Sequence, residues 1–283
     1  MLQLGIRLHD AEKLPLDRLL PTLRGQGFSC CHLALSKSFP DVPCTPSALT
    51  PGYANYLKKT FQGGGIDIAI LGNYLNLLHP DEDYLDHALR MYMAHIRFAS
   101  LLGCTMVATE TGAPNREYAF CPECREEKTL SQFIQRLKPV VRCAEQFGVI
   151  LAVEPVVRHS MWGPAACRKV LDEIGSPNLQ ILFDPVNLLD ISNVDHCDEL
   201  FQEMFELVGD EIAAVHLKDY RHSPDGKKLV TIGVAAGLGE MDYSGIMRYL
   251  KENKPHIFAT LEDSRPENAA GCAAAMQKAY EEA

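Results

Sequence analysis

The stretch Ala213-Ala214-Val215-His216-Leu217-Lys218-Asp219-Tyr220 decides the fold, because an apolar run ends there in ionisable side chains. In a strand, alternate side chains share a face, so His216 and Lys218 point one way and Leu217 the other. A polar pair at the end of a buried strand is costly unless it finds partners. Three further apolar runs end in the same manner: Val149–Glu154, Leu179–Asp184 and His256–Glu262. We therefore predict one shared site at these four strand ends.

Runs of strand length alternate with helical patterns along the whole chain. Strands are predicted at Leu2–Leu8, Phe28–Leu35, Ile66–Leu71, Met106–Glu110, Val149–Glu154, Leu179–Asp184, Ala213–Lys218 and Ile257–Glu262. Helices are predicted at Leu16–Arg24, Ser47–Gln62, Asp83–Leu102, Leu130–Phe147, Gly163–Ile174, Cys197–Leu207, Tyr243–Lys251 and Glu267–Glu281. Eight such units without a composition break predict an α/β fold, a single (β/α)8 TIM barrel forming one domain over residues 1–283. An open doubly wound sheet is the alternative, but no glycine-rich dinucleotide loop follows the first strand.

The composition is that of an ordinary globular protein, and it argues against several classes of partner. The 283 residues are 47% hydrophobic, and 27 basic against 37 acidic side chains leave a net charge of -10. This balance disfavours a protein that binds nucleic acid through its phosphates. No apolar run is long enough for a membrane span, and the first residues indicate a strand rather than a signal peptide. The 10 cysteines are scattered, as in reduced proteins, so a cytoplasmic location is expected.

The four strand ends carry a hard, oxygen-rich set of metal ligands. Glu154, Asp184 and Glu262 supply carboxylates, and His216 supplies an imidazole. Such a set suits Mn²⁺, Mg²⁺ or Co²⁺ better than a structural Zn²⁺, which prefers thiolates and tetrahedral closure. On a six-coordinate ion, four protein ligands leave two positions for adjacent oxygens of a substrate. A bound cation would also offset the mutual repulsion of the carboxylates.

Five stretches carry a resemblance to the xylose isomerase-like TIM barrels, specifically the sugar phosphate isomerase/epimerase group. They are GVILAVEP at 148–155, FDPVN at 183–187, VHLKD at 215–219, GLGEMD at 237–242 and LE at 261–262. The resemblance covers nearly the whole chain and is firmest between residues 103 and 262. Each motif alone is weak, but their order and their positions at strand ends are typical of the family. They do not specify a substrate.

The resemblance implies that Glu154, Asp184, His216 and Glu262 bind one divalent metal ion, with Mn²⁺ expected first and Mg²⁺, Co²⁺ or Zn²⁺ as alternatives. It also implies that Glu154 and Glu262 form the acid/base pair, on opposite faces of the substrate. The implied activity is that of an isomerase or epimerase in carbohydrate metabolism, acting on a sugar, keto-sugar or cyclitol. Removal of a proton next to a carbonyl would give an enediolate that the metal stabilises.

One position departs from the ketose 3-epimerase subgroup, which usually has a histidine three residues after the metal-binding aspartate. Here that residue is Asn187, which can hydrogen-bond a hydroxyl but carries no charge. Dehydratases of keto-inositols and lyases of oxidised glycosides resemble the same family and stay open as alternatives. A metal-dependent phosphodiester hydrolase and a non-catalytic sugar-binding protein are further alternatives. Family members often form dimers or tetramers, so the resemblance leaves a homo-oligomer open.

Six residues near the strand ends are candidates for substrate binding: Glu110, Lys218, Arg158, Asn187, His79 and Trp162. Five of them have a structural alternative. Lys218, Arg158 and Glu110 carry charges that a salt bridge or solvent would also satisfy. Trp162 has a ring that stacks on a sugar or packs in a core, and a hydrogen bond at a helix start would account for His79.

Two further motifs invite a ligand but are weak. Cys121 and Cys124 have the spacing of a zinc knuckle, yet no second pair follows at a suitable distance, so a plain loop is favoured. Gly237-Leu238-Gly239 lies where barrels often hold phosphates. Two glycines are little evidence for a phosphate loop, and a flexible turn is the favoured interpretation.

Overall fold

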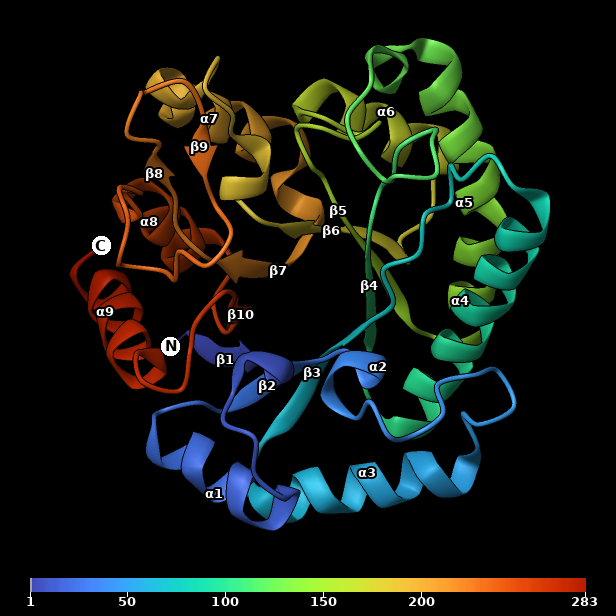
Figure 1. The fold of residues 1–283 in the computed structure, drawn as a ribbon, viewed down its shortest axis with the longest axis vertical. Helices are drawn as coiled ribbons and strands as arrows, with labels where there is room; N and C mark the ends of the chain where they lie inside the picture. The colour runs from blue at the N-terminus through green and yellow to red at the C-terminus, as the bar shows by residue number, and fades with distance from the viewer. Residues whose placement is uncertain (1) are drawn as a thin grey trace.

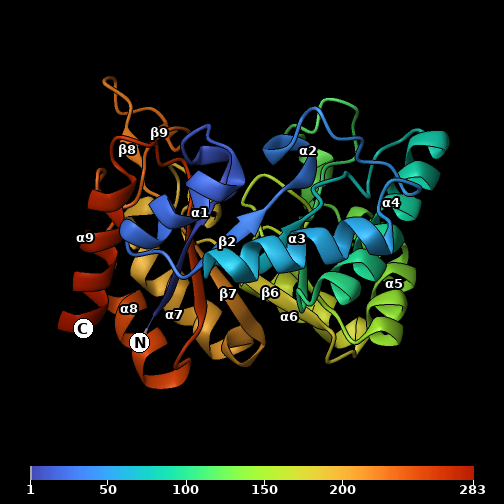
Figure 2. The same cartoon turned by 90° about the horizontal axis from the view of Figure 1, so that it is seen from below.

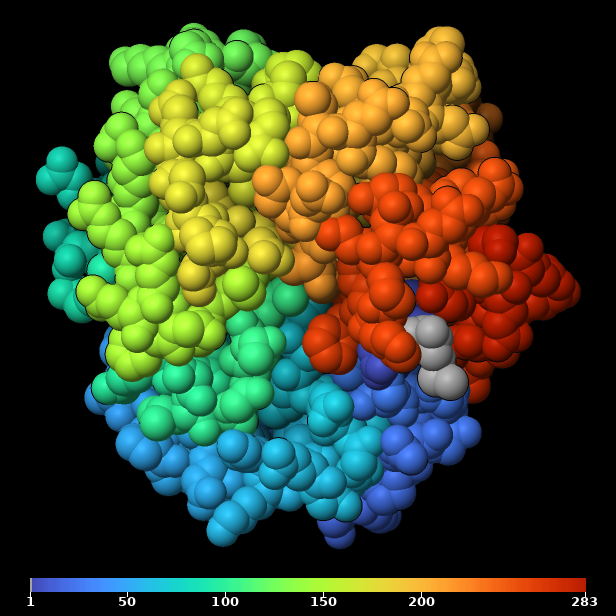
Figure 3. Space-filling model, turned by 180° about the vertical axis from the view of Figure 1, so that it is seen from behind, coloured from blue at the N-terminus to red at the C-terminus, as the bar shows by residue number. Residues whose placement is uncertain are grey.

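Eight parallel strands close into a barrel in the computed structural model, which describes residues 2–283. The barrel strands are β1 (Gln3–Arg7), β2 (Cys30–Leu33), β3 (Asp67–Gly72), β4 (Met106–Glu110), β5 (Ile150–Glu154), β6 (Leu179–Phe183), β7 (Ile212–Leu217) and β10 (Phe258–Leu261). Each strand pairs with its neighbours in the chain, and β1 pairs with β10 to complete the circle. Figure 3 shows the consequence, with the beginning of the chain (blue) directly beside its end (red). The predicted TIM barrel is confirmed.

Helices surround the barrel as an outer ring (Figure 1). They are α1 (Leu16–Gly25), α3 (Pro51–Gly64), α4 (Glu82–Leu102), α5 (Glu127–Phe147), α6 (Pro164–Ile174), α7 (Cys197–Val208), α8 (Ser244–Asn253) and α9 (Ala269–Glu282). One short helix was not expected, namely α2 (Leu35–Ser38), which takes over the end of the predicted second strand. Within residues 2–283, none of the helices has the length and hydropathy that a bilayer crossing requires.

Local signals explain where the long helices begin and end. The Asp81 side chain accepts hydrogen bonds from the backbone N–H groups of Asp83 (3.1 Å) and Tyr84 (3.3 Å), which caps the start of α4. Gly103 and Gly148 follow α4 and α5 in the left-handed conformation, with φ of 82° and 63°. A side chain at such a φ is strained, so glycine ends both helices and turns the chain into the next strand.

The two faces of the strands build two separate cores. Residues such as Val215 and Leu217 face the helices and belong to the large outer core. Ala214 lies on the opposite face of β7 and packs inside the barrel with other small or slender side chains, which are Cys30, Ala69, Ile70, Met106, Ala108, Ala152 and Leu182. Because side chains alternate along a strand, His216 shares this inner face with Ala214. The polar site therefore lies directly above the apolar interior of the barrel.

The connections at the carboxyl ends of the strands are elaborate. No strand was predicted between Lys218 and Tyr243, but residues 220–242 contain an antiparallel hairpin of β8 (Arg221–His222) and β9 (Leu229–Val230). Figure 2 shows this hairpin and α2 on one side of the barrel, whereas both chain termini lie on the other. The strand pattern escaped sequence analysis because each hairpin strand has only two residues. The segment that joins the two hairpin strands lines a cavity of about 920 Å³.

A pair of glycine substitutions tests the packing of the barrel. A Cβ on Gly5 of β1 would lie 2.7 Å from the backbone oxygen of Cys30 in β2, so Gly5→Ala should destabilise the fold by about 1–3 kcal/mol. Gly271 in α9 is exposed and has no atom near the place of an added Cβ. Gly271→Ala should therefore stabilise the protein by about 0.5–1 kcal/mol. Urea unfolding of both variants checks this, and similar effects of the two would contradict the described strand packing.

Candidate active site

The four predicted metal ligands meet at the carboxyl ends of neighbouring strands. Glu154 is the last residue of β5, Asp184 directly follows β6, His216 lies in β7, and Glu262 directly follows β10. All four side chains are buried. Ligand atoms of Glu154, Asp184 and His216 lie within 4.8 Å of one another. The parallel strands thus bring together residues that are far apart in the sequence.

His216 lies at the centre of this group. Its Nδ1 is 3.1 Å from Glu262 Oε1 and 3.4 Å from Glu154 Oε2. Neither contact has hydrogen-bonding geometry, so this buried nitrogen has no hydrogen-bond partner among the described residues. The other ring nitrogen, Nε2, is 3.1 Å from His32 Nδ1. His216 therefore presents one free nitrogen to the carboxylates while the opposite nitrogen is held.

Asp184 also has one committed and one free atom. Its Oδ1 accepts hydrogen bonds from the backbone N–H groups of Val186 (2.9 Å) and Asn187 (3.0 Å), which fix the carboxylate after the strand. Its Oδ2 has no hydrogen bond in residues 2–283, although Lys218 Nζ lies 2.9 Å away at an unfavourable angle. Lys218 Nζ is also 3.4 Å from Glu262 Oε2. The ammonium of Lys218 thus bridges two predicted metal ligands.

The residues present fit a divalent metal ion. Glu154, Asp184 and His216 offer two carboxylates and one imidazole, a donor set that such ions bind in proteins. Buried polar atoms are normally satisfied, yet Asp184 Oδ2 and His216 Nδ1 are not. Both of these atoms belong to the cluster, and Glu262 adjoins it, with Oε1 3.1 Å from the same nitrogen of His216. A cation among these atoms would satisfy them together.

The electrostatics of the cluster reflect its crowded carboxylates. Burial lowers the pKa of His216, but the negative charges of Glu262 and Glu154 outweigh burial and raise it to about 9. Burial raises the pKa of Asp184 to about 6, against the opposing effect of Lys218. Burial also acts to raise the pKa of Glu262, but His216, Lys218 and Arg7 hold it well below its usual range. Glu262 is therefore ionised throughout the neutral range.

Sequence analysis missed His32, which supports the site from β2. Its ring stacks on the ring of His216 with centroids 5.1 Å apart, and it is buried together with Glu262 in a second group of potential ligands. Burial lowers the pKa of His32 well below its usual range, so this imidazole is neutral. Gly72 leaves it room, because a Cβ there would lie 2.3 Å from His32 Nε2. A histidine inside the apolar run of the second strand was the available signal.

Two side chains orient Glu154. Asn187 Nδ2 donates to Glu154 Oε1 at 2.5 Å, and the Tyr74 hydroxyl donates to Glu154 Oε2 at 3.4 Å. Asn187 Oδ1 in turn accepts a hydrogen bond of 2.6 Å from Lys218. Asn187 was predicted to contact substrate, and the structure places it between a predicted catalytic carboxylate and the buried lysine. Tyr74 gave no signal in the sequence, because it lies in an irregular segment after β3.

A cavity of about 920 Å³ opens beside this cluster, with Asn187 in its wall. Glu110 at the end of β4 also lines it, next to Tyr118 and His159. Tyr118 donates a hydrogen bond of 3.0 Å to Glu110, and His159 Nδ1 lies 3.6 Å from the same carboxylate. Burial and the charge of Glu154 raise the pKa of Glu110 to about 7, whereas burial lowers the pKa of His159 to about 4. The wall therefore offers a carboxyl group that exchanges protons near neutral pH.

Of the three remaining residues predicted to bind substrate, one lines the cavity and two do not. Arg158 lines the cavity. The guanidinium carbon of Arg125 lies over the ring of Trp162, 4.5 Å from the centroid of that ring. His79 stacks on Tyr84 at the start of α4, with the two ring centroids 4.0 Å apart. Neither Trp162 nor His79 is among the described residues that line the cavity. Their roles in substrate binding stay predictions.

The two weak motifs find structural explanations. Cys121 and Cys124 have their sulfur atoms 3.7 Å apart, but no third ligand joins them within residues 2–283. The backbone N–H groups of Gly237 and Gly239 both donate to Asp219 Oδ2, at 3.0 and 2.9 Å. A phosphate loop needs such donors free, so the turn interpretation of these glycines agrees with the structure.

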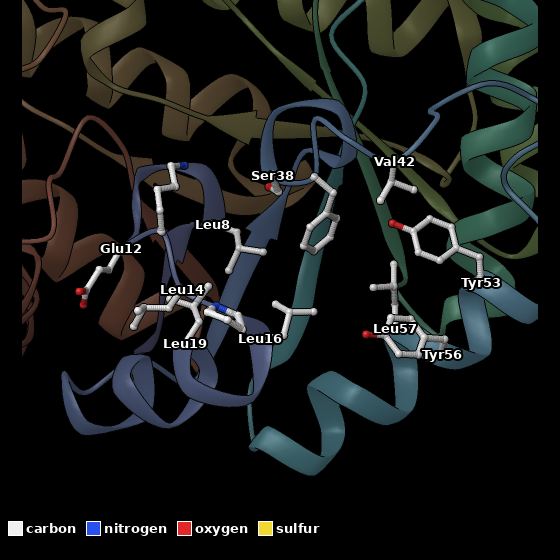
Figure 4. A pocket seen from close by; sticks show the side chains of 13 residues that line it. Leu8, Glu12, Leu14, Leu16, Leu19, Ser38, Val42, Tyr53, Tyr56 and Leu57 are labelled. Atoms are coloured by element: carbon white, nitrogen blue, oxygen red, sulfur yellow. The ribbon is translucent and has the colours of Figure 1, made fainter.

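A second pocket, of about 280 Å³, lies between α1, α2 and α3 (Figure 4). Its walls are mostly apolar, and the hydroxyl groups of Tyr53 and Tyr56 lie on one side. None of the predicted metal ligands lines either cavity, but Asn187, which hydrogen-bonds Glu154, lines the larger one. The candidate site is therefore the cluster beside the larger cavity.

Comparison with known proteins agrees with this geometry. A sequence profile described as xylose isomerase-like TIM barrel matches residues 23–281. The chain belongs to the xylose isomerase-like TIM barrel family. No curated protein sequence matches this family member closely enough to count as a relative.

Solved structures share the fold of this xylose isomerase-like barrel at low identity. The 3-keto-D-glucoside 4-epimerase from E. coli is 14% identical, with a TM-score of 0.70 over 98% of this chain and 99% of that one. A probable 3-DHS dehydratase from Bacillus anthracis is 12% identical, with a TM-score of 0.72 over 97% and 98%. The IOLI protein, with a zinc atom bound, is 17% identical, with a TM-score of 0.69 over 99% and 95%. At these identities the likeness establishes the fold.

Metal binding provides the first test of the site. We expect Mn²⁺ to bind the chelator-treated protein, and Asp184→Asn to abolish binding because it replaces a charged carboxylate ligand with a neutral amide. His32→Gln should weaken binding roughly 10–100-fold, since it removes the partner that holds His216. Isothermal titration calorimetry measures both effects. The exposed Asp195 provides the matched control, Asp195→Asn, and unchanged Mn²⁺ affinity in Asp184→Asn would contradict the assignment.

The raised pKa of His216 predicts how the stability of the metal-free protein depends on pH. Its pKa is about 9 in the folded protein and 6.5 ordinarily, so its protonation stabilises the fold fully below pH 6.5. That stabilisation should be lost as the pH rises to about 9. Thermal unfolding in the presence of a chelator should show Tm falling across this window. The His216→Asn variant should lack this component of the fall, and parallel profiles for the two proteins would refute the explanation.

Proposed function

We propose that the protein is a metal-dependent isomerase or epimerase that removes a proton next to the carbonyl of a small sugar, keto-sugar or cyclitol. The observation that carries this proposal is that Glu154 and Glu262, from two different strands, both reach His216 Nδ1, at 3.4 and 3.1 Å. Two carboxylates that approach one point from different strands can act on a substrate bound there from different directions. The family and the structural neighbours support an enzyme of this kind.

Glu154, Asp184, His216 and Glu262 would hold the metal ion, for which Mn²⁺ is our first choice. When bound, such an ion supplies Lewis-acid polarisation of a carbonyl and a neighbouring hydroxyl. Glu262 is ionised at neutral pH and is therefore in the form that can accept a proton. Asn187 and Tyr74 hold Glu154 in place by hydrogen bonds, so that its carboxyl group can return a proton. Return to the other face of the same carbon gives an epimer, and return to the adjacent carbon gives an isomer.

A dehydratase or lyase is the second candidate, and Glu110 is the observation that favours it. Loss of a β-hydroxyl group requires an acid that protonates the departing oxygen. Glu110 lines the cavity beside Tyr118, and its pKa of about 7 keeps part of its population protonated at neutral pH. One structural neighbour is a probable dehydratase.

Solvent-deuterium exchange provides the test. The Mn²⁺-loaded protein would be mixed with ketoses, keto-inositols and oxidised glycosides in D2O, and proton NMR would follow the hydrogens next to each carbonyl. We expect deuterium to enter one such position. Glu154→Gln and Glu262→Gln should each slow exchange by about 100-fold or more, because each removes an acid/base group.

Controls separate the loss of an acid/base group from other causes. Glu203→Gln changes an exposed carboxylate on α7 and should exchange like the wild type. Metal content must be matched between variants, since Glu154 and Glu262 are also predicted ligands. Exchange that survives both substitutions at equal metal content would refute the proposed roles. Product stereochemistry and loss of water then distinguish the epimerase, isomerase and dehydratase.

A further inference from the structure

We propose that the substrate of this site carries an anionic group, a carboxylate or a phosphate, which Arg158, Lys227 and Lys228 bind at the outer wall of the cavity. This inference rests on the proposed function, because it defines the substrate class of the same site. It is carried by three basic side chains from two separate loops that line one cavity.

The two loops approach the cavity from different strands. Arg158 follows Glu154 in the connection between β5 and α6. Lys227 and Lys228 lie in the β8–β9 hairpin, which follows β7. Asn187 forms part of the same cavity wall and also contacts Glu154. Asn187 therefore connects the cavity that the basic side chains line with the carboxylate cluster.

These three basic side chains are exposed and have no partner. Within residues 2–283, none of them makes a side-chain hydrogen bond or an ion pair. Elsewhere in the protein arginines do pair with acids, as Arg168 does with Asp172 and Glu211. A chain with a net charge of -10 has ample acidic side chains for such pairs. Three free cations around one cavity therefore leave positive potential that a ligand can use.

The charge of the cavity as a whole has the same sign. Its charged lining comprises four basic residues and two acidic ones, which are Arg125, Arg158, Lys227, Lys228, Glu110 and Asp190. In the adjoining cluster, a divalent cation together with Lys218 would balance the three carboxylates. The excess of basic side chains in the lining would then favour an anionic ligand.

The alternative place for an anion is already filled. Barrels often hold phosphates with the backbone N–H groups after the seventh and eighth strands. Here the Asp219 carboxylate accepts hydrogen bonds from the N–H groups of Gly237, Gly239 and Met241. A second anion at that point would meet a buried carboxylate. The basic wall is therefore where an anionic group of the substrate finds donors.

The cavity also has the size for such a substrate. Its volume of about 920 Å³ is near the upper end of the range for small-molecule sites, roughly 300–1,000 Å³. A sugar unit at the carboxylate cluster leaves room for a charged extension. Both arginine and lysine bind carboxylates and phosphates, so the shared chemistry is a terminal oxyanion.

The test compares non-reactive ligands that differ in charge. D-glucitol, D-gluconate and D-glucitol 6-phosphate would be titrated into the Mn²⁺-loaded protein by calorimetry, together with inorganic phosphate. We expect at least one anionic ligand to bind about tenfold or more tightly than D-glucitol. The triple variant Arg158→Gln, Lys227→Gln, Lys228→Gln should lose this preference. Whichever of D-gluconate and D-glucitol 6-phosphate binds more tightly identifies the oxyanion.

A matched triple variant controls for the change of net charge. Arg142→Gln, Lys59→Gln and Lys128→Gln alter three exposed cations on α3 and α5 and should keep the preference of the wild type. Thermal unfolding of both triple variants verifies that they fold. Equal affinity for D-glucitol and both anionic ligands overturns the inference, as does a preference that survives the first triple variant. The inference also fails if neither anionic ligand binds.

Failure of this inference is distinguishable from failure of the proposed function. If neutral ketoses exchange deuterium as fast as their acidic or phosphorylated counterparts, the proposed function stands and the anionic substrate is refuted. If the anionic ligands bind through the three basic residues but no carbon-bound hydrogen exchanges in any acidic sugar, the anion site stands and the proposed chemistry is refuted.

Discussion

Three carboxylates are buried side by side at one end of the barrel, and most features of the site follow from the need to balance them. Glu154, Asp184 and Glu262 are taken out of water together, which is costly without nearby positive charge. Lys218 lies 2.9 and 3.4 Å from two of them, and His216 faces the third. Two polar atoms of the cluster are still unsatisfied. A divalent cation bound among these side chains would complete the balance of charge.

The barrel makes this concentration of charge possible by placing it at the edge of a firm scaffold. Strand pairing fixes the positions of the backbone, and the interior below the site is filled by small apolar side chains such as Ala108 and Ala214. Next to the cluster, the loops are held by their own polar contacts. The Asp219 carboxylate accepts hydrogen bonds from three backbone N–H groups of the loop after β7, and the Tyr118 hydroxyl donates one to Glu110. Rigid strands therefore carry the chemistry, while the loops shape the cavity.

The cavity and the cluster differ in charge, and this difference bears on the kind of substrate that would bind there. The cluster is rich in carboxylates and prefers a metal ion, whereas the outer wall is rich in free basic side chains such as Arg158 and Lys228. A molecule that spans both would present oxygens at one end and a negative charge at the other. Asn187 connects the two regions, because it lines the cavity and hydrogen-bonds both Glu154 and Lys218.

The sequence by itself determined the barrel and the four residues of the cluster. Strand and helix periods are local, and polar residues that end parallel strands must meet at one face, so no long-range information was needed. The partners of those residues were decided by tertiary structure. That His32 stacks on His216, that Asp219 occupies the glycine N–H groups, and that a hairpin brings Lys227 to the cavity all depend on the geometry of segments distant in sequence. Such contacts are fixed by strand register and loop packing, which leave no periodic signal in the chain.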